Sequence, residues 1–206
     1  FQPDSLQVSS SLHTRANILR DLNKPKEAEP LYQQALEIID SICGEQSLLY
    51  NQILGDYGDN LRVSRKLSEA CEVLQKASSG IQTLVGKRHI LNGDHMLAFA
   101  MANIDLMTED KHHIALAMLN ETILPCYVNV VGDSHPASIF TRGLIGLVEL
   151  LNVTPRTTRS ADDLTESTTP QDRIDDALDY FSGYKQRNFS PLQPWVRYLG
   201  GFLEER

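Results

Sequence analysis

The side chains best suited to metal binding or acid–base chemistry are six histidines and three cysteines. His112 and His113 are adjacent, so on a helix they point about a hundred degrees apart and cannot form the i, i+4 pair of a helical zinc site. No CxxC spacing joins Cys43, Cys71 and Cys126. Such a sparse, odd set indicates reduced structural thiols, and the sequence predicts neither a metal site nor a cofactor.

Motifs for nucleophilic or phosphate chemistry are also missing. The segment Thr141-Arg-Gly-Leu-Ile-Gly146 has a GxxG spacing, but no strand precedes it, and its glycines suit close helix packing better than a phosphate loop. There is no Walker motif and no GxSxG nucleophile elbow. We therefore expect no catalytic residues, and predict that the protein is not an enzyme.

Composition narrows the class of partner. The 206 residues carry a formal net charge of -8, with 41% hydrophobic and 22% charged residues, as in a globular domain. Nucleic-acid binding rests on clustered Lys and Arg, so this balance opposes it. No apolar run of about 18 residues is evident, so no membrane insertion is expected. The thiols favour the cytoplasm or another reducing compartment; because the chain starts at Phe1, organelle import stays open.

The elements that position these residues are set by an internal repeat. Ala28, Ala70 and Ala115 recur at intervals of 42 and 45 residues, each inside a similar helical segment. A second marker keeps step with them, since Gly follows the apolar stretch each time and suits the end of a helix. The glycines are Gly44, Gly86 and Gly132. Two markers in step predict stacked helix pairs.

Small and large residues alternate within each pair. A bulky residue stands four positions after each of these alanines and after Ala177 of a weaker fourth copy, which fills the next space on the same helix face. Small residues also stand on the preceding helices. Repeat three departs from this pattern, and its small position is taken by Asn103 or, with a shift of one residue, by Ala102. The bulky set is Tyr32, Leu74, Leu119 and Phe181; the other small residues are Ala16, Gly58 and Gly146.

Two segments carry a resemblance to a known family. They are Lys26-Glu-Ala-Glu-Pro-Leu-Tyr-Gln-Gln-Ala-Leu-Glu-Ile38 and Gly132-Asp-Ser-His-Pro136. The sequence resembles the tetratricopeptide repeat family, in its long-period, kinesin-light-chain-like type, well over residues 1–150 and loosely over 171–187. The resemblance implies an all-α fold, a right-handed α-α superhelix of about four helix pairs with a C-terminal capping helix. Expected helices are 4–22, 25–43, 46–64, 67–85, 93–108, 111–131, 136–152 and 171–187, with Pro125 kinking or ending the sixth.

Three regions are expected along the chain. Residues 1–152 hold the repeats, 153–170 form a flexible Ser/Thr/Pro-rich insertion, and 171–206 hold the last repeat helix and a C-terminal cap. Arginines beside Thr157 and Thr158 leave phosphorylation of the insertion as a weaker hypothesis. The aromatic tail residues Trp195, Tyr198 and Phe202 either cover the end of the repeats, which we favour, or anchor a partner.

The resemblance also implies where a partner binds, because the first helices of each pair line the inner surface in this family. Carried over by alignment, that surface is polar at one end, where it suits an extended peptide and its acidic groups, and apolar at the other, where the residues are either a docking face or core. The candidates are His13, Asn17, Arg20, Gln52, Asp59, Arg62, Ile104 and Met107.

These observations predict a non-catalytic protein-interaction scaffold, either an adaptor or a structural subunit of a large assembly. The partner is expected to be a peptide or a subunit. Two alternatives stay open: an RNA-binding helical-repeat protein, and a regulatory repeat segment of a larger enzyme. The acidic balance opposes the first of these.

Overall fold

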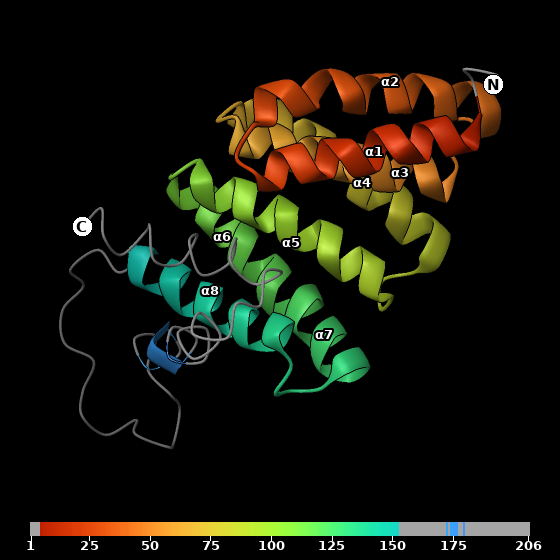
Figure 1. Cartoon of the computed structure of the whole chain (residues 1–206). Coiled ribbons are helices and arrows are strands. Elements are labelled where there is room, and N and C mark those ends of the chain that lie inside the picture. Colours follow the sequence, from red (N-terminus) through yellow and green to blue (C-terminus); the bar gives the residue numbers. More distant parts are fainter. Residues whose placement is uncertain (1–4, 153–171, 173, 177–178, 180–206) are drawn as a thin grey trace, which may run out of the picture. The chain divides into compact units, whose positions relative to one another are not determined.

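The computed structural model describes residues 5–152, 172, 174–176 and 179, and in that part of the chain the secondary structure is entirely helical. The predicted 153–170 insertion and the tail with Trp195, Tyr198 and Phe202 lie outside the described residues. So does most of the predicted helix 171–187, including Ala177 and Phe181, although its residues 172, 174–176 and 179 are described as helical. The chain divides into two compact units between Ala115 and Leu116. Figure 1 shows the helices of both units.

The first unit is a succession of antiparallel helix pairs. Its elements are α1 (Leu6–Asp21), α2 (Pro25–Cys43), α3 (Leu48–Val63), α4 (Leu67–Val85), α5 (Ile90–Asp105) and the start of α6 (Glu109–Met118). Each helix packs on the next from α1 to α5, and the first helices of successive pairs also touch, α1 on α3 and α3 on α5. This order, each pair buried by its neighbour, is that of a tetratricopeptide solenoid.

The turns inside the pairs share one backbone conformation. Asn23, Arg65 and Met107 have φ values of 59°, 63° and 56°, and successive members stand 42 residues apart. Asn tolerates this left-handed region, whereas Arg and Met adopt it at a cost. The repetition shows that the fold imposes the turn at each place, whatever residue occupies it.

The turns between pairs repeat as well. Gly44, Gly86 and Gly132 follow the second helices with φ of 73°, 87° and 96°, a region in which a side chain is strained. Three residues after Gly44, the Ser47 hydroxyl accepts the amide of Tyr50 at the start of α3. The predicted role of these glycines as helix ends is confirmed.

The recurring alanines occupy equivalent places in the core. Ala28, Ala70 and Ala115 are all completely buried. Ala102 and Asn103, expected at the small position of repeat three, do not hold it. The 42-residue register from Ala16 and Gly58 leads to Ala100, which is also completely buried.

Helix boundaries agree with the predicted ones to within two residues in the first two pairs. The third pair differs, because α5 begins at Ile90 and not near residue 93. Its start is set by His89, whose ring accepts the amide of Leu91. Histidine is an uncommon residue at this capping position, which is why the sequence alone suggested a longer loop.

The second unit contains the rest of α6, the π-helical turn η1 (Leu119–Ile123), α7 (Leu124–Val131) and α8 (Pro136–Asn152), which packs on η1 and α7. Pro125 was expected either to kink this helix or to end it. The helix does not end there, because α7 continues to Val131. Proline lacks the amide that would bond the carbonyl four residues back and would crowd it. The wider turn, with the Leu124 amide bonded to the Leu119 carbonyl, comes directly before it.

One expectation about apolar stretches needs correction. By length and composition alone, the helical stretch Glu109–Val131 would suffice to cross a membrane, although no such run was expected. The histidines and acidic residues near its start hide this property when the sequence is read by eye. Core helices of soluble proteins meet the same criterion, so the stretch is weak evidence for a membrane contact.

Candidate functional site

A cluster of polar side chains joins α1 to α3. The His13 Nε2 atom lies 2.6 Å from the Asp56 Oδ2 atom, and the Asn17 amide donates to the same carboxylate at 3.3 Å. Arg20, one turn further along α1, places its Nη1 3.4 Å from Asp56 Oδ1 and 3.7 Å from Asp59. Helical spacing puts these α1 residues on one face, which is the face turned to α3.

The cluster continues from α3 to α5 through Arg62. Its Nε lies 2.8 Å from Asp59 Oδ1, and its Nη1 lies 3.2 Å from Asp105 Oδ2. The Arg62 and Asp105 side chains are only 12% and 4% exposed. Arg20 and Arg62 stand 42 residues apart, so the same arginine position in two repeats binds a carboxylate on the following first helix.

Tyr32 of α2 also contacts the cluster. Its hydroxyl donates to the Asn17 Oδ1 atom at 2.5 Å, and its ring lies 6.1 Å from the imidazole of His13. Burial raises the pKa of Tyr32 above its ordinary value, so the hydroxyl stays a donor. Asn17 is thereby oriented to present its amide nitrogen toward Asp56.

His95 of α5 packs against α3 next to Asp56. Its ring lies against Gly55, where a Cβ would collide with the imidazole, so glycine makes room for it. Burial lowers the pKa of His95, although Asp56 and Asp94 partly oppose that shift. A largely neutral imidazole therefore fills the place that a side chain at position 55 would take.

The carboxylates of Asp56 and Asp59 remain ionised although they are partly buried. Burial by itself would raise the pKa of Asp56, but the hydrogen bond with His13 and the charge of Arg20 outweigh it, and the pKa falls below its ordinary value. The pKa of Asp59 is lowered in the same way, with Arg62 and Arg20 outweighing burial.

This cluster differs from the binding end that the sequence suggested. Arg20 and Arg62 were expected to receive acidic groups of a partner, but both guanidiniums already face the protein's own carboxylates. The two guanidiniums pair with four carboxylates, those of Asp21, Asp56, Asp59 and Asp105, so acidic side chains outnumber the arginines here. We call the set formed by His13, Asn17, Arg20, Asp56, Asp59 and Arg62 the polar surface.

The other candidates are dispersed. Gln52 is half-buried on α3, Met107 is exposed at the α5–α6 turn, and Ile104 is completely buried, so the apolar end is core where Ile104 lies. Sequence reasoning missed Asp56, Asp105, Tyr32 and His95. Asp56, Asp59 and Arg62 follow at intervals of three residues and are the only charged residues of α3, and that charged stripe was the available signal.

Within the described residues, no group of three or more His, Cys, Asp and Glu side chains is placed to hold a metal ion. The polar surface also lacks a nucleophile activated by a neighbouring base, since His13 pairs with a carboxylate and not with a Ser or Cys. Its geometry suits hydrogen bonding and charge recognition.

Comparisons with known proteins agree with this architecture. Residues 8–47 match the tetratricopeptide repeat family. The chain is similar to crystal structures of kinesin light chain-like TPR repeats from Podosopora anserina, at a TM-score of 0.66 with 13% identity, covering 98% of this chain and 97% of the other. A single-site variant of the same repeats matches with a TM-score of 0.65 and 14% identity, covering 100% of this chain and 97% of the other. No curated protein sequence matches.

These likenesses establish the fold, and the match over residues 8–47 covers α1, α2 and the turn that leads into α3. The family's repeats generally mediate protein–protein interactions, and no catalytic family is found. Residues 8–47 therefore match a tetratricopeptide repeat, and the chain has an all-α fold like that of kinesin light chain-like repeats.

Proposed function

We propose that this protein is a non-catalytic scaffold that binds a protein partner, as a peptide or a subunit, through the polar surface of α1 and α3. The single observation that carries the proposal is the charge-paired cluster built from His13 to Arg62 across successive repeats. It is held in one geometry by its own ion pairs and hydrogen bonds. A pre-ordered surface costs little side-chain entropy when a partner binds.

The charge of this surface indicates the chemistry of the partner. Asp56 and Asp59 keep 29% and 22% of their side-chain surface exposed, more than Arg20 or Arg62. Carboxylates at the surface of a net-acidic chain favour amide donors and basic side chains. We therefore propose a partner segment with Lys, Arg or free backbone N–H groups facing Asp56 and Asp59.

The same charge opposes the RNA alternative. Phosphate backbones need clustered cations, and here each arginine is already paired with a carboxylate. Tight RNA binding that weakens steeply with salt would contradict the proposed function.

The experiment is affinity capture with cross-linking and mass spectrometry, comparing the native chain with Asp56→Asn. The substitution keeps the size of the side chain and removes the exposed charge. Glu27→Gln is the matched control, because Glu27 pairs with Lys24 at an exposed place on α2. We expect partner yield to fall with Asp56→Asn and to stay unchanged with Glu27→Gln, both variants remaining folded by circular dichroism.

Equal yields from all three proteins would exclude the polar surface as the binding site. The behaviour of the isolated chain then separates the two forms of the proposal. An adaptor stays soluble alone and binds its peptide reversibly, whereas a structural subunit loses solubility without its assembly.

A further inference from the structure

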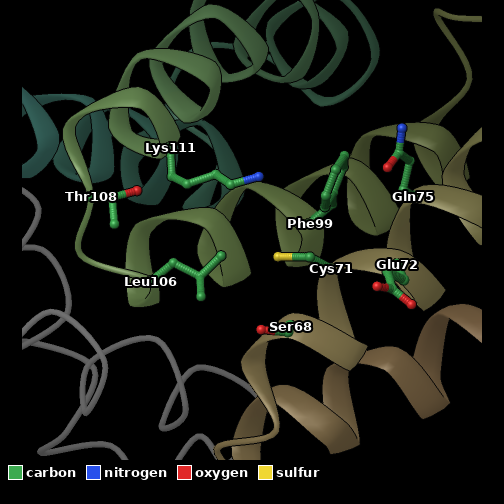
Figure 2. A pocket seen from close by; sticks show the side chains of 8 residues that line it. All are labelled: Ser68, Cys71, Glu72, Gln75, Phe99, Leu106, Thr108 and Lys111. Carbon is green, nitrogen blue, oxygen red and sulfur yellow. The ribbon is translucent and has the colours of Figure 1, made fainter.

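A hollow of about 360 Å³ opens between α4, α5 and the start of α6, all within the first unit. Figure 2 shows the thiol of Cys71 and the ammonium of Lys111 extending from opposite sides into the space beside Phe99. None of the residues around it belongs to the polar surface. The hollow is lined by Ser68, Cys71, Glu72, Gln75, Phe99, Leu106, Thr108 and Lys111.

The equivalent place one repeat earlier, between α2, α3 and α4, is closed by polar side chains. The Lys66 Nζ atom bonds the Glu29 Oε1 atom at 2.7 Å across it. Beside that pair, the Gln33 amide donates to the Tyr57 hydroxyl at 3.3 Å. Two bridges therefore span the first junction.

The 42-residue register shows why the second junction is open. Glu29 corresponds to Cys71, and Lys66 corresponds to Thr108, so the ion pair is replaced by two short side chains. Tyr57 corresponds to Phe99, which has no hydroxyl to receive the amide of Gln75. The loss of both bridges leaves the hollow.

The charge at one position of the hollow is also reversed. Lys111 takes the place of Glu69 in the repeat register. Among the described residues no carboxylate pairs with Lys111, and Cys71 stands where the first junction has the carboxylate of Glu29. The floor is apolar, formed by Cys71, Phe99 and Leu106. An apolar floor beside an unpaired ammonium complements an apolar group that carries a carboxylate.

We propose that this hollow binds a segment of a partner protein in which an apolar side chain lies beside a carboxylate. The apolar side chain enters between Phe99 and Leu106, and the carboxylate pairs with the Lys111 ammonium. Glu72 lies on the α4 side and repels a carboxylate there, which fixes the orientation of the segment. This is a second binding site, on other residues and of opposite charge preference to the polar surface.

The test uses N-acetyl-leucine as the probe and N-acetyl-leucinamide, which lacks the carboxylate, as its matched control. Each is titrated into the ¹⁵N-labelled full chain and followed by NMR. We expect N-acetyl-leucine to shift the amide signals of Cys71, Leu106 and Lys111, with the amide binding about fivefold more weakly, the most that an exposed ion pair contributes.

Charge variants test the assigned roles. Lys111→Met should lower the affinity for N-acetyl-leucine to that for N-acetyl-leucinamide. Glu72→Gln should leave the affinity for N-acetyl-leucine equal or slightly higher. Equal affinity of the acid and amide probes, an unchanged affinity in Lys111→Met, or no shift of these signals at the highest probe concentration would each overturn the proposal.

A third variant closes the hollow with the residues that occupy the equivalent positions of the first junction. The combination Cys71→Glu, Thr108→Lys and Phe99→Tyr transplants the bridges of the first junction, so it is compatible with the fold. We expect it to abolish the shifts caused by the probe while the melting temperature stays at or above that of the native chain. Partner capture through the polar surface should persist in this variant, which separates a failure of this site from a failure of the proposed function.

Discussion

His13 and Asp56, 43 residues apart in the chain, meet at 2.6 Å where α1 packs on α3. The contact joins one repeat to the next through a pair that is half-buried on the polar surface. Asp56 also pairs with Arg20, and its charge acts on His95 of α5, so a single carboxylate interacts with side chains of both neighbouring first helices. Changes of charge at this point should therefore alter the stability of the stacked repeats together.

The first prediction concerns the pH dependence of stability. Burial lowers the pKa of His95 below its ordinary 6.5, so the unfolded chain binds this proton more tightly than the folded chain. The contribution of neutral His95 is thus complete above pH 6.5 and is lost as the pH falls through that value toward the folded pKa. We expect the melting temperature to fall between about pH 7 and pH 5, and to fall less in His95→Gln.

His113→Gln serves as the control, because His113 is exposed on α6 and should leave the slope unchanged. A His95→Gln profile parallel to that of the native chain would contradict the assignment. The lowered pKa values of Asp56 and Asp59 act in a separate, more acidic window, since their contribution is lost only as the pH falls below their ordinary value of 3.8.

The second prediction concerns the buried pair of Arg62 and Asp105. Arg62→Met leaves the Asp105 carboxylate without this guanidinium in a site where only 4% of its surface is exposed. Breaking a buried pair from one side costs about 3 kcal/mol of unfolding free energy, which urea denaturation measures. The double variant Arg62→Met, Asp105→Leu should recover a large part of that loss, because the buried charge is gone.

Lys24→Met gives the comparison for an exposed pair. Lys24 and Glu27 are 53% and 60% exposed, and removing one of them should cost less than about 1 kcal/mol. Equal losses in the Arg62 and Lys24 variants would mean that water reaches Asp105 and that the polar surface is looser than its geometry implies.

The sequence predicted the helix pairs of the first unit because its repeat markers are local and independent. Ala28, Ala70 and Ala115 fix which face is buried, while Gly44 and Gly86 fix where the second helices end. Each marker acts within a few residues of itself, so it can be recognised without knowing the tertiary contacts. The start of α5 was missed because His89 is an unusual cap.

The partners within the polar surface could be predicted only in part. Register alone assigned five of its residues, namely His13, Asn17, Arg20, Asp59 and Arg62. What they bind depends on contacts between helices about 40 residues apart, and an ion pair across a packing interface leaves no periodic signal in a single chain. The hollow beside Lys111 was missed for a related reason, since it is defined by bridges that are lost and not by residues that are gained.

The third prediction concerns the close approach of α3 and α4. A Cβ at Gly58 would lie 2.6 Å from the Cγ atom of Leu74, a side chain that is completely buried. Gly58→Ala gains about 1 kcal/mol of helix propensity, but overpacking of this kind costs about 1–3 kcal/mol, so we expect a net loss of stability. In a Leu74→Ala background the same substitution should instead be stabilising, and a loss of equal size in both backgrounds would refute the steric explanation.

The last prediction compares two turns whose backbones lie at positive φ. Met107 has φ of 56° and is 57% exposed, so its side chain contributes little packing to offset the strain. Met107→Gly should therefore raise the unfolding free energy by up to about 1 kcal/mol, since glycine adopts this region freely. Gly44→Ala should lower it by about 1 kcal/mol or more, because φ of 73° with ψ of 163° is a region nearly reserved for glycine. Urea denaturation measures both changes in unfolding free energy, and we expect them to have opposite signs. If both substitutions were destabilising, the Met107 side chain would have to make a stabilising contact that outweighs its backbone strain.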